Sequence, residues 1–197
     1  MIAGYFGGLI DSALSTIFNV LLAIPQFVLA LALVTVLANT QVDASGGQHA
    51  PSSLRRLLVL MFALGIVSVP ILARITRANA LQWSQREFVL AARAQGATNR
   101  RVMVREVLPN VLPAMFSIAL LAVAIVIVVE GGLSILGVGV LPPAVSWGNM
   151  IALGREDLRN LPYEVFEPIA CIFLTVLSLN FLGDVVRSRF DVRESAL

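Results

Sequence analysis

The side chains that most often carry out chemistry are scarce in this sequence. Its 197 residues include one histidine, one cysteine and no lysine. We expect His49, in a polar loop, to be solvated, because a metal site needs three or four clustered ligands. Cys171 lies in an apolar run and can form no disulfide within the chain. A phosphate-binding P-loop and Schiff-base chemistry both require a lysine. The sequence therefore predicts no catalytic residue, no metal site and no cofactor in this chain.

Glu130 follows directly after a long apolar run. A carboxylate in that position is costly unless it faces other helices or water. Two interpretations stay open: a hydrogen-bonded residue at a helix interface near the outer surface, or a residue of a transport path. A proton relay is not indicated, because the sequence shows no chain of ionisable partners for Glu130.

A charged, alanine-rich segment interrupts the apolar sequence at residues 86–110, REFVLAARAQGATNRRVMVREVLPN. Its first half is rich in strong helix formers, and Gly96 can adopt the left-handed conformation that ends a helix. A second short helix should follow, with Arg101 and Arg105 on one face. Asn110 is a good N-cap, and Pro113 would then fall in the first turn of a new helix. We therefore predict a helix, a glycine hinge, a second helix and a fresh helix start at Asn110.

Two kinds of partner are compatible with this segment. An amphipathic helix edged with arginine can lie on a membrane surface and bind anionic headgroups. Small residues such as Ala91, Ala92 and Gly96 also allow close backbone approach, which binding to lipid does not require. A surface of that kind suits docking into a groove on another protein. The spacing favours the protein groove and leaves the lipid surface as the alternative.

The elements around this segment are apolar enough to cross a membrane. The chain is 58% hydrophobic and only 13% charged, which is unusual for a soluble domain. Four stretches hold no charged residue, and a bilayer core needs about 20 apolar helical residues. They are residues 12–42, 57–73, 107–129 and 168–183. The predicted fold is therefore an all-α, polytopic membrane helix bundle with about four transmembrane helices.

The arginines predict the orientation of these spans. The polar segments 74–106 and 184–197 hold ten of the fourteen arginines, and four spans place both segments on one side. The positive-inside rule places that side in the cytoplasm. The prolines predict local distortions, with a kink near Ile24 caused by Pro25 and another at Pro70. The Gly- and Pro-rich residues 131–149 indicate the end of the third span and an irregular external loop.

Five short motifs in this chain occur in the same order in a known family. AARAQGA followed by LPN resembles the EAA motif of ABC importer permeases, with Ala91, Ala92 and Gly96 in register. The other motifs resemble the dipeptide, oligopeptide and nickel permease family, in its second-subunit branch, and the likeness covers essentially the whole chain. They are AGYFGG at 3–8, LSILGVGVLPP at 133–143, SWGNM at 146–150 and LNFLGD at 179–184.

This resemblance implies a function and a set of partners. The chain would be one permease domain, residues 1–197, of a binding-protein-dependent ABC importer for short peptides, in a bacterial inner or plasma membrane. It would pair with a second homologous permease, two ABC ATPases that hold ATP and magnesium, and an extracytoplasmic substrate-binding protein. No nucleic acid is expected. Residues 82–106 would form a cytoplasmic coupling loop and residues 139–163 an external loop.

The resemblance also assigns roles to particular residues. Glu130 remains a candidate residue of the transport path. A coupling helix seated in an ATPase groove would transmit ATP-driven closure to the membrane helices. The residues that would contact the ATPase are Glu87, Leu90, Ala91, Ala92, Arg93, Gly96 and Ala97. The structural motifs would contribute Leu108, Pro109, Asn110, Gly183 and Asp184.

The sequence departs from the family pattern in two ways. Leu90 stands where the motif carries glutamate, and Glu87 lies one turn earlier on a similar helix face. Family members also have about six spans, so we expect this chain to lack the N-terminal portion that precedes AGYFGG. A nickel or other small-solute importer of the same family remains an alternative. A secondary transporter would show paired inverted repeats, and an intramembrane serine protease would need a histidine within a span.

Overall fold

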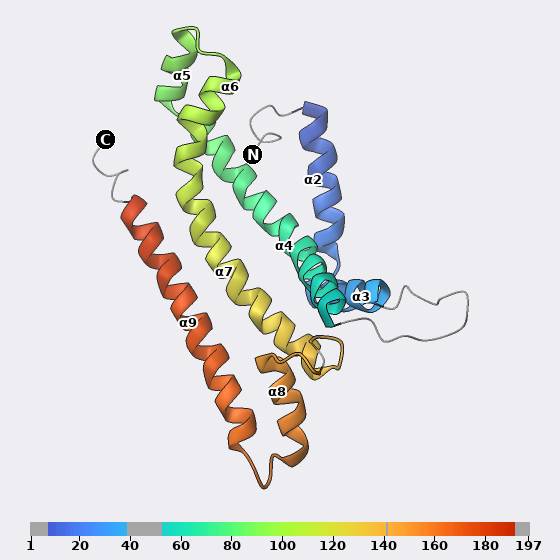
Figure 1. Cartoon of the computed structure of the whole chain (residues 1–197). Coiled ribbons are helices and arrows are strands. Elements are labelled where there is room, and N and C mark those ends of the chain that lie inside the picture. Colours follow the sequence, from blue (N-terminus) through green and yellow to red (C-terminus); the bar gives the residue numbers. More distant parts are fainter. Residues whose placement is uncertain (1–7, 39–52, 141, 192–197) are drawn as a thin grey trace. The chain divides into compact units, whose positions relative to one another are not determined.

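Every regular element in the part of the chain that the structure describes is a helix (Figure 1). The structure is a computed structural model, and it describes residues 8–38, 53–140 and 142–191. The predicted all-α fold is confirmed. The elements are α2 Gly8–Ala23, α3 Gln26–Ala38, α4 Ser53–Ser84, α5 Glu87–Ala94, α6 Asn99–Arg101, η1 Val102–Val107, α7 Leu108–Ile135, α8 Trp147–Gly154, η2 Arg155–Asp157 and α9 Tyr163–Asp191.

Three helical stretches are long and apolar enough to cross a membrane. They are Leu54–Ser84, Asn99–Ile135 and Tyr163–Arg189. A fourth span is present if the broken pair Asp11–Ala23 and Gln26–Leu37 counts as one. This agrees with the prediction of about four spans: three are continuous helices, and the first predicted span corresponds to the broken pair.

Proline has different consequences in the first two predicted spans. The chain leaves the helical conformation at Ile24 and Pro25, between α2 and α3, as the missing N–H of proline leads us to expect. The carbonyl of Pro25 then accepts the N–H of Leu29 at 3.0 Å, in the first turn of α3. By contrast, α4 remains one helix through Pro70, whose side chain is fully buried.

The segment after α7 is more ordered than the predicted irregular loop. Within residues 139–163 the structure contains α8 and the 3-10 helix η2. Ser146 begins α8 with extended backbone, and its side-chain oxygen accepts the N–H of Asn149. An N-cap serine of this kind satisfies one of the free N–H groups at a helix start, so a short helix forms despite the surrounding glycines and prolines.

The contacts divide the chain into two compact units, which we describe separately. Unit 1 comprises Met1–Ala23, Val69–Ala122 and Asn180–Leu197, and unit 2 comprises Ile24–Ser68 and Val123–Leu179.

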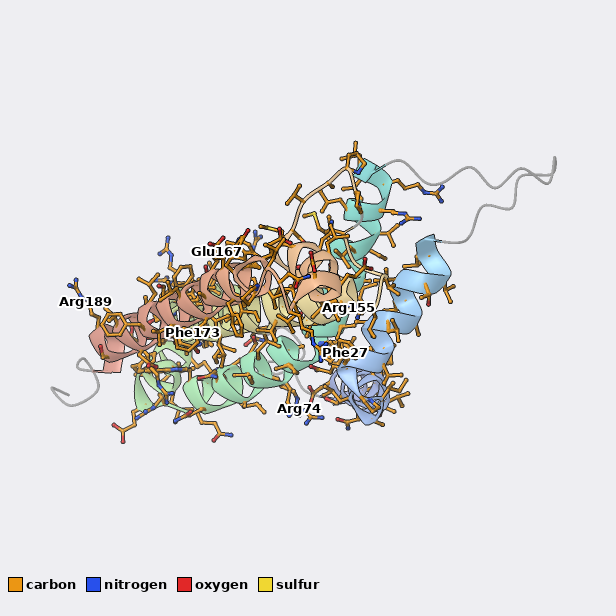
Figure 2. All side chains as sticks on the ribbon, turned by 90° about the horizontal axis from the view of Figure 1, so that it is seen from below. Phe27, Arg74, Arg155, Glu167, Phe173 and Arg189 are labelled. Carbon is orange, nitrogen blue, oxygen red and sulfur yellow. The ribbon has the colours of Figure 1, made fainter. Side chains whose placement is uncertain are left out.

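In unit 1, polar side chains connect α2 to α4. The guanidinium of Arg77 donates from two nitrogens to the two carboxylate oxygens of Asp11. One turn earlier, Arg74 (labelled in Figure 2) donates to the side-chain carbonyl of Asn19 at 2.8 Å. Charged groups in an apolar helix need such partners, so these bonds explain how α4 carries Arg74 and Arg77 in a membrane-length segment.

In unit 2, an apolar core joins α3, the first half of α4 and the end of α7. Its buried members come from all three helices and surround Leu133 of α7. The ring of Phe27 (Figure 2) closes against Gly132, where an added Cβ would lie 2.9 Å from its Cε2 atom. A glycine at this position therefore lets α3 approach α7. The core residues are Ala30, Val34, Leu60, Ala63, Leu64, Val67 and Leu133.

Some residues named in the sequence analysis lie outside the described part of the chain. These are residues 3–7 of AGYFGG, His49, Leu141 of LSILGVGVLPP and residues 192–197 of the C-terminal segment.

Candidate functional site

The charged segment folds as two short helices joined by a tight turn at the end of α4 (Figure 1). Helix α5 ends at Ala94, and Gly96, the residue after its C-cap, has a φ of +83°. Ala97 donates its N–H to the carbonyl of Ala92 at 3.0 Å, and Gly96 donates to that of Arg93 at 2.9 Å. This pair of bonds defines a Schellman motif, whose left-handed residue is usually glycine. The predicted glycine stop at Gly96 is confirmed.

The second short helix, α6, begins at Asn99, directly after its N-cap residue Thr98. Thr98 has extended backbone and its hydroxyl oxygen accepts the N–H of Arg101 at 3.4 Å. The turn between α5 and α6 is thus closed on one side by a helix C-cap and on the other by an N-cap. The hydrogen bonds that define this turn all lie within the chain, so its shape does not require contact with another protein.

A small apolar core lies beneath the two helices. Five side chains with no exposed surface form it, and Trp83, Ala92, Ala97 and Met115 pack around it. Two of these side chains, Val102 and Val107, come from VMVREV, whose third valine, Val104, is exposed. The five are Ala80, Val89, Val102, Val107 and Val111.

Helix α5 consequently has two distinct faces. Val89 and Ala92 lie on the face towards the core. The opposite face carries residues at positions i, i+3, i+4 and i+7, which share one side of a helix. All four are exposed, and they are Glu87, Leu90, Ala91 and Ala94.

The predicted ATPase-contact residues therefore divide between these faces. Glu87, Leu90, Ala91, Arg93 and Gly96 are exposed. Ala92 and Ala97 pack against the core of their own chain. The contact of these residues with an ATPase stays a prediction; among the small residues, Ala91, Ala94 and Gly96 are exposed, and Ala92 and Ala97 are half-buried.

The start of α5 includes an aromatic and cationic cluster that the sequence analysis did not identify. The guanidinium carbon of Arg86 lies 5.2 Å from the centroid of the Trp83 ring. The rings of Trp83 and Phe88 are 6.1 Å apart and tilted by 53°. Cation–π and tilted aromatic contacts each stabilise a local arrangement, so this cluster holds the junction between α4 and α5.

The LPN motif does not begin a new helix. Residues 99–135 form one continuous helical stretch, so the predicted start at Asn110 is wrong. The side chain of Asn110 donates to the carbonyl of Glu106 at 2.6 Å instead of capping a helix. The π-helical turn η1 lies before Pro109, and Leu108 donates to the carbonyl of Met103, five residues back. This wider turn accommodates the missing N–H of Pro109 within the helix.

The LNFLGD motif contributes a close helix contact in unit 1. Gly183 is buried, and its carbonyl accepts the hydroxyl of Ser117 at 2.8 Å. A Cβ at Gly183 would meet the carbonyl oxygen of Ser117 at 3.4 Å. Small residues allow membrane helices to approach in this way. The neighbouring Asp184 is exposed.

Glu130 is a half-buried residue of unit 2, and two serine hydroxyls fix its carboxylate. Oε1 of Glu130 accepts the hydroxyl of Ser134 at 2.6 Å and that of Ser146 at 2.9 Å. Each serine oxygen in turn accepts a backbone N–H, from Val140 at 3.2 Å and from Asn149 at 3.1 Å. The hydroxyl hydrogens are therefore directed at the carboxylate.

Glu130 also borders a pocket that lies entirely within unit 2. The pocket has a volume of about 670 Å³ and is lined by parts of α4, α7, α8 and the segment before α8. Sequence reasoning placed Glu130 near the outer end of a span but could not find Ser146, because the contact joins an α7 residue to the N-cap of another helix. No motif signals such a pair.

The described helices define a class of protein: a helical membrane protein with a charged helical segment between two membrane-length helices. Comparison with known sequences then gives the family. Residues 1–195 match the family described as binding-protein-dependent transport system inner membrane component, and the chain belongs to this family. The resemblance found in the sequence motifs is thereby confirmed.

Individual relatives support the same assignment. The chain is 35% identical over 191 residues to the dipeptide transport system permease protein DppC of Alkalihalophilus pseudofirmus, covering 97% of this chain and 58% of the relative. It is 30% identical, with the same coverage of both, to the glutathione transport system permease protein GsiD of Pectobacterium atrosepticum. For GsiD of Escherichia coli the identity is 32%, covering 95% and 56%. The chain thus spans less than two thirds of the length of these relatives.

Proposed function

We propose that this chain is a membrane permease subunit of an ABC importer for short peptides. The family description names a component of a binding-protein-dependent transport system, and the cited relatives are named for dipeptide and glutathione transport. Both of those solutes are short peptides, which favours peptides over nickel or another small solute. The chain would form part of the translocation path, and it would itself carry out no covalent chemistry.

The observation that carries the coupling role is the outer face of α5. It presents a carboxylate, one leucine and two alanines on a short helix whose other face is buried in a core of its own. An ATPase groove can seat such a helix closely, because alanine side chains keep the backbone within reach of the partner. The partners would be two ABC ATPases, a second permease and an extracytoplasmic binding protein.

The proposed mechanism transmits motion through α4 and α7. Helix α5 follows α4 after two residues, and α6 continues into η1 and α7. A displacement of α5 by ATP-driven closure of the ATPases would therefore act on two membrane-length helices at once. The binding free energy of ATP would then bias an equilibrium between outward- and inward-facing states.

A substitution on the outer face of α5 tests this proposal. Ala91→Glu adds bulk and a charge to an exposed position, so the chain should still fold and insert. Docking should fail, because a carboxylate desolvated in a protein contact without a partner costs several kcal/mol. We expect loss of ATPase co-purification and of radiolabelled dipeptide uptake, at constant permease level in the membrane.

Two matched controls accompany this variant. Ala91→Ser keeps the residue small and should retain docking. Gln82→Glu adds the same charge at an exposed position at the end of α4, outside α5, and should behave as the wild type. Wild-type uptake by Ala91→Glu, with the ATPase still bound, would contradict the proposal and favour a helix that only binds the lipid surface.

A further inference from the structure

The pocket beside Glu130 combines one negative charge with an apolar wall. Among its lining residues the polar side chains are Ser68, Glu130, Ser146 and the indole N–H of Trp147, and none is basic. The remaining wall is made of leucine, valine, isoleucine and methionine side chains with one glycine. Its volume of about 670 Å³ falls within the usual range of small-ligand sites, roughly 300–1,000 Å³.

The carboxylate is held in position for a ligand. Both serine hydrogen bonds reach Oε1, and Oε2 accepts none from any residue that the structure describes. Glu130 is only half-buried, and its side chain lines the pocket. An accessible oxygen on a carboxylate whose other oxygen is fixed is a preorganised acceptor for a cationic N–H group.

A close backbone contact supports this arrangement. A Cβ at Gly148 would lie 2.6 Å from Cα of Gly131 and 2.9 Å from Cβ of Ser134, so α8 begins in direct contact with α7. This contact places the N-cap Ser146 within reach of Glu130. The position of the Glu130 carboxylate is therefore fixed in part by the backbone contact between α7 and α8, and not only by the rotamer of its own side chain.

A purely structural role explains only part of these observations. It accounts for the two bonds to Oε1, one within α7 from Ser134 and one from Ser146 that joins α7 to the start of α8. It does not account for an apolar pocket whose single charge has an open oxygen and no basic neighbour among the lining residues. A ligand with an ammonium group and an apolar body complements both features.

We infer that this pocket binds the free amino terminus of a short peptide, with Glu130 as the residue that recognises the ammonium group. The inference rests on the proposed function, because it takes its substrate class from there. Oε2 of Glu130 accepts an N–H of the ammonium, the apolar wall takes the first side chain, and Trp147 can lie against the cation. Glu130 binds the substrate and takes part in no bond-breaking step.

Direct binding of a dipeptide tests the inference. The chain is purified in lipid nanodiscs with the subunits that accompany it, without binding protein or ATP, and radiolabelled leucyl-leucine is measured by equilibrium dialysis. Glu130→Gln keeps an acceptor oxygen for both serines, removes the charge and puts an amide N–H donor in place of Oε2. We expect it to weaken the Kd for leucyl-leucine by about tenfold or more, as the loss of a charge partner does.

Two controls separate the charge from the fold and from the apolar wall. Glu167→Gln removes the same charge from an exposed site on α9 in the same unit (Figure 2) and should leave the Kd unchanged. N-acetyl-leucyl-leucine lacks the ammonium and should bind the wild type at least about tenfold more weakly. This second comparison requires no variant, so it holds even if Glu130→Gln fails to fold.

The outcomes distinguish this inference from the proposed function. Equal affinity for the free and acetylated dipeptides, no binding, or an unchanged Kd in Glu130→Gln would each overturn the inference. ATP is absent from the measurement, so the Kd does not depend on ATP-driven coupling. A chain that binds leucyl-leucine through Glu130 but co-purifies with no ATPase would contradict only the proposed coupling. A chain that docks an ATPase but shows no role for Glu130 would contradict only the ammonium site.

Discussion

At the scale of single residues, Gly148 and Gly131 lie in the same contact between helices, but an added Cβ would meet different neighbours at each. The start of α8 approaches α7 so closely that a Cβ on Gly148 would lie within 3.0 Å of three atoms of Gly131 and Ser134. A Cβ on Gly131 would meet only Cδ1 of Ile172, at an ordinary 3.8 Å. Two buried glycines in the same contact therefore differ in what they tolerate.

This difference predicts opposite effects of the same substitution. Gly148→Ala must push α8 from α7 and should destabilise the protein by about 1–3 kcal/mol, as overpacking does. Gly131→Ala should be neutral or stabilise by up to about 1 kcal/mol, because alanine is the better residue inside a helix. Thermal unfolding of both variants in the same detergent measures the difference. Equal melting temperatures would contradict the described contact between α8 and α7.

Sequence reasoning succeeds at Gly96 and fails at Gly148 for a physical reason. A helix stop depends on local backbone conformation, and the pattern of alanines before Gly96 and polar residues after it contains that information. The requirement at Gly148 arises from Gly131, seventeen positions earlier and on another helix. The same holds for Ser146, the partner of Glu130 that became apparent only once α8 was placed on α7.

At the scale of elements, α5 is an amphipathic helix whose two faces serve different contacts. The side towards the core carries Val89 and Ala92, and the outer side carries Leu90 and Ala91. Leu90 is 55% exposed although it is apolar, whereas Val89 has no exposed surface. The two faces of α5 therefore differ in exposure as well as in their contacts.

The two faces predict different consequences of adding a carboxylate to neighbouring alanines. Ala92→Glu should disrupt the core beneath α5 at a cost of several kcal/mol, because it buries a charge among apolar side chains. Ala91→Glu should leave that core intact. Limited trypsin digestion measures this, since a loosened segment exposes the bonds after Arg93 and Arg100. Rapid cleavage is expected for Ala92→Glu, and wild-type cleavage for Ala91→Glu; the reverse order would show that the faces are wrongly assigned.

The elements around α5 show what local patterns can and cannot predict. A helix in the first half of residues 86–110 and its stop at Gly96 were predicted, and the structure gives α5 as Glu87–Ala94. The fresh start at Asn110 was wrong, because asparagine caps a helix only where backbone N–H groups lack partners. Here the preceding turns are already helical, so Asn110 bonds back to Glu106. Whether a helix continues through LPN depends on the π-helical turn before it, which no propensity scale describes.

At the scale of the whole molecule, the described helices are long and apolar enough for several membrane spans. Their length and composition do not show which helix ends face the cytoplasm. The arginine distribution supplies it. Residues 74–106 hold seven arginines, whereas residues 39–56 and 155–167 hold two each. Basic residues near span ends are retained on the cytoplasmic side. The charged segment with α5 should therefore face the cytoplasm, as a docking site for an ATPase must.

Single cysteines test this orientation directly. The native Cys171 is exposed on α9, so the experiment starts from Cys171→Ala. Gln95→Cys, at the exposed end of α5, should react with a membrane-impermeant maleimide only after the membrane is opened. Glu156→Cys, in the exposed 3-10 helix after α8, should react in intact spheroplasts.

A third site makes the topology test independent of the segment after α8. Ser45→Cys lies in the polar stretch between the first two predicted spans, and it should react from the same side as Glu156→Cys. This pattern requires the chain to cross the membrane an odd number of times between Ser45 and Gln95, and α4 provides one crossing. The same is required between Gln95 and Glu156, where α7 provides one crossing. Labelling of Gln95→Cys and Glu156→Cys from one side would mean that α7 does not cross the membrane. If that side were the outside, the outer face of α5 could contact no ATPase in the cytoplasm.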